Sequence, residues 1–246
     1  MISMRLAKYL ALSGYCSRRA ATRLIRDAKV IIDGRVANHI DTVTLLDIAT
    51  GQACQEKIVV EGTLVTAVEA KAYWLFNKAV GTDSRLLAEL PNSLLHLLPK
   101  SPRLYPVGRL DKDSHGLLIL TNDGELTHQL MHPDFGHSKT YHVQVDRPFD
   151  AVFLAKMAAG VSYKDVTTLP CTITRMAADR YEIILTQGLN RQIRRMSQSL
   201  GYKVIDLKRV SIQSLQLGDL ANGEMRPLSS AELTALRASL DLNASS

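Results

Sequence analysis

Cysteine is scarce in this chain of 246 residues, and the three that occur, Cys16, Cys54 and Cys171, are odd in number and far apart. They form no Cys-x-x-Cys pair, which argues against a disulfide framework and against a zinc site. Long apolar runs are also absent, since no stretch approaches the roughly 20 residues that a membrane helix needs. The N-terminus lacks the pattern of a signal peptide. We therefore expect a folded cytoplasmic protein that does not enter a membrane.

Positive charge is concentrated at one end of the chain. The net charge is +6, from 30 Lys and Arg against 24 Asp and Glu. Residues 1–37 contain eight basic and two acidic residues, a net +6, so the remaining 22 basic and 22 acidic residues balance. A small, strongly basic surface suits binding to a phosphate backbone, because each neutralised phosphate releases condensed counterions. A basic face that only aids solubility is the alternative that composition leaves open.

The basic segment predicts two short helices. The first covers Arg5–Leu12 and is ended by Gly14, whose backbone tolerates the left-handed conformation of a helix terminus. The second runs to Ala28 and begins after Ser17, a residue type that caps helix N-termini. Its apolar residues share one face, so the helix is expected to pack on that side only.

The polar face of the second predicted helix carries Arg19, Arg23 and Arg26 at helical spacing. A hairpin follows over Val30–Val36, because its central Asp33-Gly34 pair readily adopts the positive φ angles of a tight turn. The helix would then pack on a small sheet with its arginines directed toward phosphates.

The stretch MRLAKYLALSGYCSRRAATRLIRDAKVIIDGRVA resembles the small S-four-type RNA-binding domain. The resemblance implies that the two helices and the hairpin turn cradle a bent RNA backbone. It gives the RNA-binding role to Arg5, Lys8, Arg18, Arg19, Arg23 and Arg26. Further β-type residues occupy Ile58–Val60 and Leu64–Val68, and the charge pattern changes at Glu69–Ala72. We therefore predict an RNA-binding domain over residues 4–68 and a second domain over residues 72–240.

The second predicted domain alternates short apolar runs with turns, which indicates an α+β fold and not a regular βαβ succession. The expected strands cover Tyr73–Phe76, Leu117–Leu120, Tyr141–Val145, Tyr181–Leu185 and Val204–Val210. The expected helices cover Glu125–Met131, Phe149–Ala159 and Arg191–Leu200, with a terminal helix after Ser229.

The segment PVGRLDKDSHGLLILTNDGEL places Asp111 in a loop between Gly108 and Gly116, directly before a buried strand. Loops that are anchored on a rigid strand often carry catalytic residues. Asp111 and Asp113 also invite a metal interpretation, because with Gly116 they match positions 1, 3 and 6 of a calcium loop.

The calcium interpretation fails at two other positions of that loop. His115 stands at position 5, and Asn122 replaces the bidentate glutamate expected at position 12. A magnesium-dependent phosphoryl transferase stays conceivable from the Asp-x-Asp pair alone, although no glycine-rich phosphate loop with a following lysine accompanies it.

The segment LTQGLNRQIRRMSQSLG places Arg191, Arg194 and Arg195 on one face of a predicted helix. A guanidinium brought against Asp111 would orient its carboxylate through a paired contact. The alternative is that these arginines only cover a solvated helix face, and spacing alone does not exclude it.

The segment HSKTYHVQV begins a strand with Tyr141, whose ring could stack on a base displaced from its helix. A half-buried strand tyrosine without a ligand is the more common situation.

The segments GRLDKDSHGLLILTNDGEL, KTYHVQV and QGLNRQIRRM together resemble the pseudouridine synthases of the RsuA/RluB/RluE/RluF group, with the RluF-type branch most similar. The resemblance extends from Arg5 to about Leu236. It implies a catalytic domain with a mixed, largely antiparallel sheet, no metal and no organic cofactor. Asp111 would be the catalytic carboxylate, Tyr141 would lie against the uracil, and Arg194 would pair with Asp111.

The resemblance further implies that Arg109 helps to hold the RNA open and that Arg191 and Arg195 contact RNA. The reaction would convert one uridine of ribosomal RNA, in the large subunit, to pseudouridine by flipping it out, breaking its glycosidic bond and rejoining the base through C5. We expect a monomer, and tRNA stays open as a second substrate. The sequence departs from the family at Asn77–Gly81, which lacks the usual proline of Asn-Lys-Pro-x-Gly, and the loop before Arg85 is shortened.

Two other functions are considered. One is a non-catalytic RNA-binding factor for ribosome assembly, against which the complete set of Asp111, Tyr141 and Arg194 argues. The other is a hydrolase of the glycosidic bond, but the second carboxylate expected of common glycosidases has no candidate beyond Asp113 or Asp123.

Overall fold

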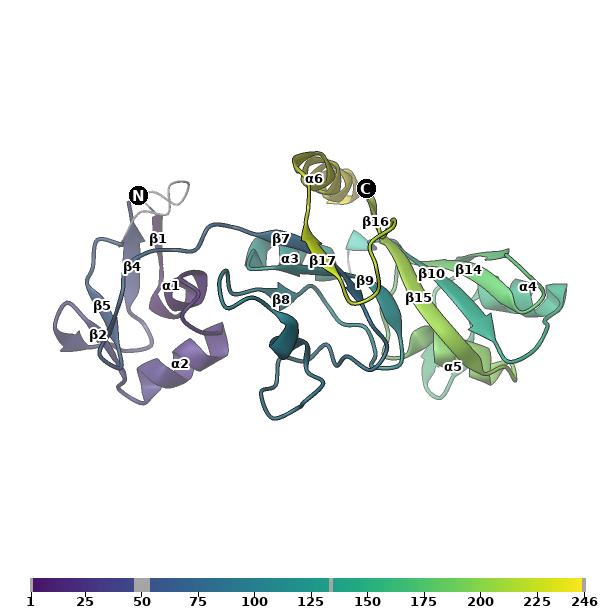
Figure 1. Ribbon diagram of the computed structural model, residues 1–246, viewed down its shortest axis with the longest axis horizontal. Coiled ribbons are helices and arrows are strands. Elements are labelled where there is room, and N and C mark those ends of the chain that lie inside the picture. Colours follow the sequence, from purple (N-terminus) through teal and green to yellow (C-terminus); the bar gives the residue numbers. More distant parts are fainter. Residues whose placement is uncertain (1, 47–53, 133–134, 245–246) are drawn as a thin grey trace. The chain divides into compact units, whose positions relative to one another are not determined.

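The computed structural model describes residues 2–46, 54–132 and 135–244, with side chains up to Leu240. The chain divides into two compact units (Figure 1). The first contains the residues up to Ala72 together with Pro99–Leu104, and the second contains the rest. The domain bounds 4–68 and 72–240 stay predictions, and no pattern in the sequence pointed to Pro99–Leu104 as part of the first unit.

The first unit combines two short helices with six strands among its described residues. In chain order these elements are β1 Ile2–Arg5, α1 Leu6–Leu12, α2 Arg18–Arg26, β2 Val30–Ile32, β3 Arg35–Val36, β4 Thr42–Leu45, β5 Ile58–Val60 and β6 Thr63–Val65. The strands form an antiparallel sheet in the order β3-β2-β5-β6 and a separate β1-β4 pair. A core that includes Tyr9, Leu10, Ala21 and Ile25 joins the helices to the sheet.

Local signals explain the helix boundaries in this unit. The Ser17 side chain accepts a hydrogen bond from the Ala20 N–H, which caps α2 as predicted. The predicted start of α1 at Arg5 is wrong, because Arg5 pairs with Thr42 as the last residue of β1. The predicted end of α2 at Ala28 is also wrong, since Ala28 adopts a left-handed φ of 55° two residues beyond the helix.

The second unit contains the remaining elements. Its strands are β7 Tyr73–Lys78, β8 Tyr105–Pro106, β9 His115–Thr121, β10 Lys139–Val145, β11 Ser162–Tyr163, β12 Val166–Thr167, β13 Thr172–Arg175, β14 Arg180–Leu185, β15 Val204–Ile212, β16 Leu215–Gln216 and β17 Met225–Pro227. Its helices are the 3₁₀ helix η1 Leu94–Leu97, α3 Gly124–Met131, α4 Ala151–Ala159, α5 Gln192–Ser199 and α6 Ser230–Ala244.

One sheet organises the second unit. Its main path runs β13-β14-β10-β15-β9-β7-β17, with β16 beside β15 and β8 beside β9. Every pairing in this sheet is antiparallel except the one between β15 and β9. The predicted α+β fold with a mixed, largely antiparallel sheet is therefore confirmed.

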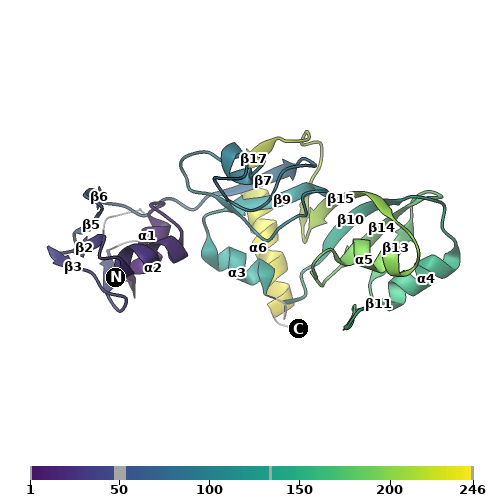
Figure 2. The same ribbon diagram turned by 90° about the horizontal axis from the view of Figure 1, so that it is seen from below.

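The helices of the second unit form two separate cores with the sheet. Helices α3 and α6 pack with β7 and β9 around Leu117 and Ile119, and Figure 2 shows both helices beside these strands. Helices α4 and α5 pack with β10, β14 and β15 around Tyr181 and Met196. Within the described part of the chain, no helix is long and apolar enough to cross a membrane.

Two predicted helix starts need correction. Asp150 accepts a hydrogen bond from the Phe153 N–H at 2.8 Å, so α4 begins at Ala151 and not at Phe149. Helix α5 begins at Gln192, because Arg191 adopts the left-handed conformation, with φ 52° and ψ 35°.

Candidate active site

A cleft of about 750 Å³ lies within the second unit. Arg109, Asp111, Tyr141 and Arg191 all line it. These residues come from the loop before β9, from β10 and from the N-terminal end of α5. The structure therefore brings together side chains that three separate sequence motifs had singled out.

The loop that carries Asp111 is fixed by hydrogen bonds to the segment after β7. The buried Ser84 hydroxyl donates to the Leu110 carbonyl at 2.7 Å and accepts from the Leu110 N–H at 3.2 Å. The Gly81 N–H donates to the Lys112 carbonyl at 2.8 Å, and the Ser114 N–H donates to the Asp111 carbonyl at 3.0 Å. The backbone on both sides of Asp111 is thereby held, which limits the positions that its carboxylate can adopt.

Arg191 lies between the two aspartates of this loop. Its Nη1 is 3.7 Å from the Asp111 Oδ2, and its Nη1 and Nη2 donate to the two Asp113 carboxylate oxygens at 2.9 and 2.7 Å. This bidentate contact is the largest cause that holds the pKa of Asp113 below its usual value. The left-handed backbone at Arg191 is strained for a residue with a side chain, and such strain is common at functional sites.

The predicted pairing of Arg194 with Asp111 is not the arrangement observed. Arg194 Nη2 donates to the Asp113 carbonyl at 2.6 Å and to the Ser114 hydroxyl at 3.2 Å, and Nη1 donates to the Val204 carbonyl at 3.0 Å. Its Nε lies 3.4 Å from an Asp113 carboxylate oxygen. Through these contacts Arg194 fastens the Asp111 loop to α5 and β15, while Arg191 reaches Asp111.

Four residues form a single row across the sheet next to this loop. Lys78 of β7 pairs with Gly116 of β9, Gly116 pairs with Arg209 of β15, and Arg209 pairs with Tyr141 of β10. Residues paired across adjacent strands project toward the same face of a sheet. Because Gly116 has no side chain, the row presents two cations, Lys78 and Arg209, and one aromatic ring, that of Tyr141.

Tyr141 and Arg109 sit in environments that suit their predicted roles. Tyr141 is half-buried, packs against the core of α4 and α5, and borders the cleft. Arg109 is exposed at the cleft, next to the loop residue that precedes Asp111. Contact of either side chain with RNA stays a prediction.

Two lysines contribute amines here: Lys78, a buried member of this row, and Lys139, which is half-buried and stands two residues before Tyr141. Burial lowers the pKa of Lys78 to about 8, while Asp111 and Asp113 act in the opposite direction. Burial also lowers the pKa of Lys139 to about 8, and the neighbouring Arg209 adds to the effect. Lys139 and Arg209 both line the cleft.

Sequence reasoning had singled out none of these three cations. One signal was available for Lys139, because it stands two residues before Tyr141 on a predicted strand and alternate residues of a strand share a face. Arg209 lies within an apolar run whose pairing partners the sequence does not specify.

The predicted RNA-binding arginines of the first unit are exposed, and two of them, Arg5 and Arg26, also contact neighbouring residues. Arg18, Arg19 and Arg23 are exposed on α2, and Arg26 is exposed beside Asp27, at 3.1 Å. Arg5 donates to the Ile40 carbonyl. This surface agrees with the predicted basic face, but its contact with RNA, like that of Lys8, stays a prediction.

Arg195, predicted to bind RNA from the second unit, donates to the Asn190 side chain at 2.8 Å. The RNA contacts of Arg191 and Arg195 also stay predictions.

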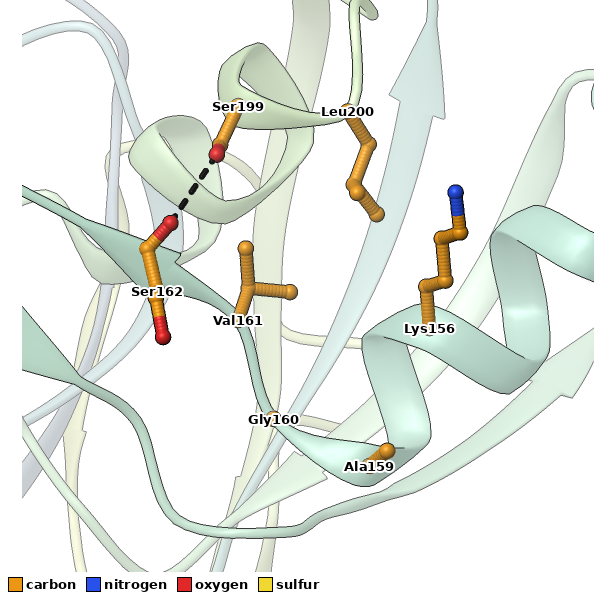
Figure 3. A pocket seen from close by; sticks show the side chains of 7 residues that line it. All are labelled: Lys156, Ala159, Gly160, Val161, Ser162, Ser199 and Leu200. Carbon is orange, nitrogen blue, oxygen red and sulfur yellow. Dashed lines mark hydrogen bonds between the residues drawn. The ribbon is translucent and has the colours of Figure 1, made fainter.

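A second hollow, of about 290 Å³, lies between the C-terminal ends of α4 and α5 (Figure 3). Lys156 is its one charged lining residue, and the Ser199 hydroxyl donates to the Ser162 carbonyl across it at 3.1 Å. It contains no carboxylate or aromatic ring. The large cleft is therefore the stronger candidate for a catalytic site.

The side chains around the large cleft give no support for metal chemistry. Both carboxylate oxygens of Asp113 already accept hydrogen bonds from Arg191. No group of three or more His, Cys, Asp or Glu side chains that could hold a metal occurs among the described residues.

Two protein-family models match different parts of the chain. The family model for RNA pseudouridylate synthase matches residues 72–199, and the S4 domain model matches residues 4–42. The Dual-specificity RNA pseudouridine synthase RluF of Escherichia coli (strain K12) is 38% identical over 236 residues, covering 95% of this chain and 78% of that protein.

Two further comparisons extend over most of the chain. The Ribosomal large subunit pseudouridine synthase B of Bacillus subtilis (strain 168) is 34% identical over 245 residues, covering 96% of this chain and 97% of that protein. A solved structure, "Crystal structure of pseudouridylate synthase", is similar with a TM-score of 0.67 and 28% identity, covering 95% of this chain and 99% of that chain.

Proposed function

The chain belongs to the RNA pseudouridylate synthase family, and on this premise we propose that it isomerises one uridine of large-subunit ribosomal RNA with Asp111 as the catalytic carboxylate. The predicted family, the two-domain fold and the class of enzyme, an RNA pseudouridine synthase, are confirmed. The observation that carries the proposal for Asp111 is its position: a carboxylate on a hydrogen-bonded loop, beside Arg191, in a cleft that also contains Tyr141.

The geometry suits chemistry on a base that has left its helix. A flipped uridine must enter a cleft to be reached, and an aromatic side chain such as Tyr141 stabilises it there by stacking. Asp111 then faces the sugar, where a carboxylate can attack C1′, accept a sugar proton or stabilise positive charge. Arg109, exposed at the cleft, is proposed to hold the RNA in the open form.

The finer identity of the substrate rests on the relatives' names. One relative is named for the ribosomal large subunit, and another is named as dual-specificity, which supports a second RNA substrate for this chain, for which tRNA is the candidate. The basic face of α2, with Arg19 and Arg23 exposed, supports a role in backbone binding. Action as a monomer in the cytoplasm, where ribosomal RNA is made into ribosomes, completes the proposal.

The experiment is pseudouridine mapping of total RNA from cells that lack the protein. These cells are then supplied with wild type, with Asp111→Asn, or with Asp219→Asn as a matched control. Asp219 is exposed and does not line the cleft. We expect one large-subunit uridine to lose its modification and to regain it with wild type and the control variant only.

The Asn substitution removes the charge of Asp111 and nearly preserves its shape, so RNA affinity is expected to stay within about twofold of wild type. If Asp111→Asn restores the modification, the catalytic assignment is wrong. If no ribosomal or transfer RNA site depends on the protein, the substrate assignment fails, and an RNA-binding factor for ribosome assembly becomes the better account.

A further inference from the structure

Arg209 is a buried cation with unused hydrogen-bond donors. It is only 4% exposed. Its Nε donates to the Leu117 carbonyl at 2.7 Å, while its Nη2 is buried and has no partner among the described residues. Buried guanidinium donors without partners are costly, because they have lost water without gaining another acceptor. Arg209 lines the cleft, so reorientation of its guanidinium on ligand binding would present this buried donor to a molecule bound there.

Lys139 lines the same cleft and also lacks a counterion. Its Nζ donates to the His137 carbonyl at 3.0 Å. The neighbouring charge that acts on the pKa of Lys139 is that of Arg209, another cation, which lowers it further. No carboxylate pairs with either side chain in the described part of the chain. Buried charges in proteins are normally paired, so two neighbouring unpaired cations indicate that the missing negative charge arrives with the ligand.

We propose that Arg209 and Lys139 form an anion subsite that stabilises the uracil ring as an anion after it separates from the ribose. This inference rests on the proposed function, because it assigns these two residues a task in the same reaction. Both would contact the oxygens or nitrogen over which the negative charge spreads. The position of both residues in the sheet supports a uracil ring as the ligand. Arg209 pairs directly with Tyr141, and Lys139 stands two residues before Tyr141.

The electron balance explains why such a subsite is needed. When the C1′–N1 bond breaks, its electron pair leaves with the base, which becomes an anion with charge shared by N1, C5, O2 and O4, so that C5 can form the new bond. When C5 bonds to C1′, the pair returns to the sugar and the ring is neutral again. C5 then loses its proton, and N1 gains one, so no atom is added or removed. Preorganised cations stabilise the charge that develops in the first step.

A backbone phosphate is the competing occupant, and burial argues against it. A phosphodiester is tetrahedral and remains joined to the RNA chain on both sides, whereas the 4% exposure of Arg209 favours a small flat ring. Exposed cations such as Arg109 and Lys112 are better placed for phosphates.

The first test measures binding of a stable pyrimidine anion to the whole protein without RNA. Ligand-detected NMR compares barbiturate, a flat pyrimidine anion at neutral pH, with neutral uracil. We expect wild type to bind barbiturate at least tenfold more tightly than uracil. Lys139→Met and Arg209→Lys should reduce that preference to about twofold or less, while Lys139→Arg should retain most of it.

The matched control is Lys208→Met, which removes a charge from the same strand as Arg209. Lys208 pairs with His115 and His142 in the next row and does not line the cleft. Thermal unfolding identifies any variant that fails to fold, and Lys139→Met, which alters the less buried of the two cations, then carries the result. A wild type without preference for barbiturate, or an equal loss of preference in Lys208→Met, would overturn the proposal.

The second test uses the leaving group. In single turnovers on RNA with the target uridine, Lys139→Met should slow loss of that nucleoside about 100-fold, the size of effect seen when one donor to a developing anion is removed. With 5-fluorouridine at the same position, the defect should shrink several-fold, because fluorine itself stabilises the departing anion. A structural role would slow both substrates equally.

The two tests separate failure of the inference from failure of the proposed function. Equal defects on both substrates, together with a shallower salt dependence of RNA binding, would assign Lys139 to a phosphate and refute the subsite. If wild type prefers barbiturate but modifies no RNA, the anion subsite stands and the proposed substrate is wrong.

Discussion

Gly116 belongs to the row of Lys78, Gly116, Arg209 and Tyr141 across the sheet, and its position does not accommodate a side chain. It is the second residue of β9, with a φ of +103°. A Cβ added there would lie 2.2 Å from the Arg209 carbonyl oxygen and 2.8 Å from the Arg209 nitrogen. These are backbone atoms of the neighbouring strand, so no side-chain rotation relieves the contact. We therefore predict that Gly116→Ala disturbs the pairing of β9 with β15.

The expected destabilisation has two parts. A residue with a side chain in a sparsely populated backbone region costs about 1–3 kcal/mol. Forcing an extra methyl group into a packed interior adds about 1–3 kcal/mol. Together these give roughly 2–6 kcal/mol, a large fraction of the roughly 5–15 kcal/mol by which domains are stable. For a protein of this size that corresponds to a fall in Tm of roughly 5–20 °C.

Urea unfolding followed by circular dichroism measures this effect, and Gly188→Ala serves as the control. Gly188 has an ordinary negative or extended φ, and an added Cβ there would meet nothing within 4 Å. The control should stay within about 1 kcal/mol of wild type. If Gly116→Ala is destabilised by less than about 1 kcal/mol, the close approach of the two strands is not a constraint on this position, and the argument from the row is refuted.

Two further predictions concern charge. Neutralising Arg19, Arg23 and Arg26 together should weaken RNA binding and flatten its salt dependence by about one unit of slope for each phosphate that the helix no longer neutralises, and an unchanged slope would remove α2 from the interface. Glu232 pairs with Arg226 at 2.7 Å, and this contact is the main reason why the pKa of Glu232 falls from 4.5 to about 2. The pair therefore stabilises the fold above pH 4.5 and loses that effect as the pH falls toward 2. Because the pair is partly exposed, Glu232→Gln should cost only about 1 kcal/mol at neutral pH, and a difference from wild type that persists unchanged at pH 2 in denaturant titrations would contradict the assignment.

Short-range signals in the sequence predicted most elements of this fold. The Ser17 cap and the Asp33-Gly34 turn depend on a few neighbouring residues, and the structure contains both. Alternating apolar runs likewise located β7, β9, β10, β14 and β15 to within a few residues. One wrong boundary arose where a distant partner decides the backbone, at Arg5, which pairs with Thr42 to form a strand that no local pattern indicated.

The site was predictable in its loop and not in its pairings. The two glycines around Asp111 marked a loop before a strand, and that much is local. Arg191 reaches Asp111 from a left-handed backbone conformation. Helical spacing alone does not distinguish Arg191 from Arg194 as the partner of Asp111. Lys139 and Arg209 become neighbours of the site only through the register of β10 with β15, which includes a bulge between Thr140 and Tyr141.

The charges around the cleft also explain how a carboxylate can lie close to RNA, which is a polyanion. Asp111 by itself would repel RNA, and Asp113 would add to the repulsion. Asp113 is neutralised by Arg191, and Lys78 lies close enough for Asp111 to raise its otherwise lowered pKa. With Arg209 and Lys139 added, the buried and half-buried cations outnumber the acids. The cleft can therefore attract a phosphate backbone while Asp111 remains in its lining, and the same excess of positive charge is available to a base that leaves as an anion.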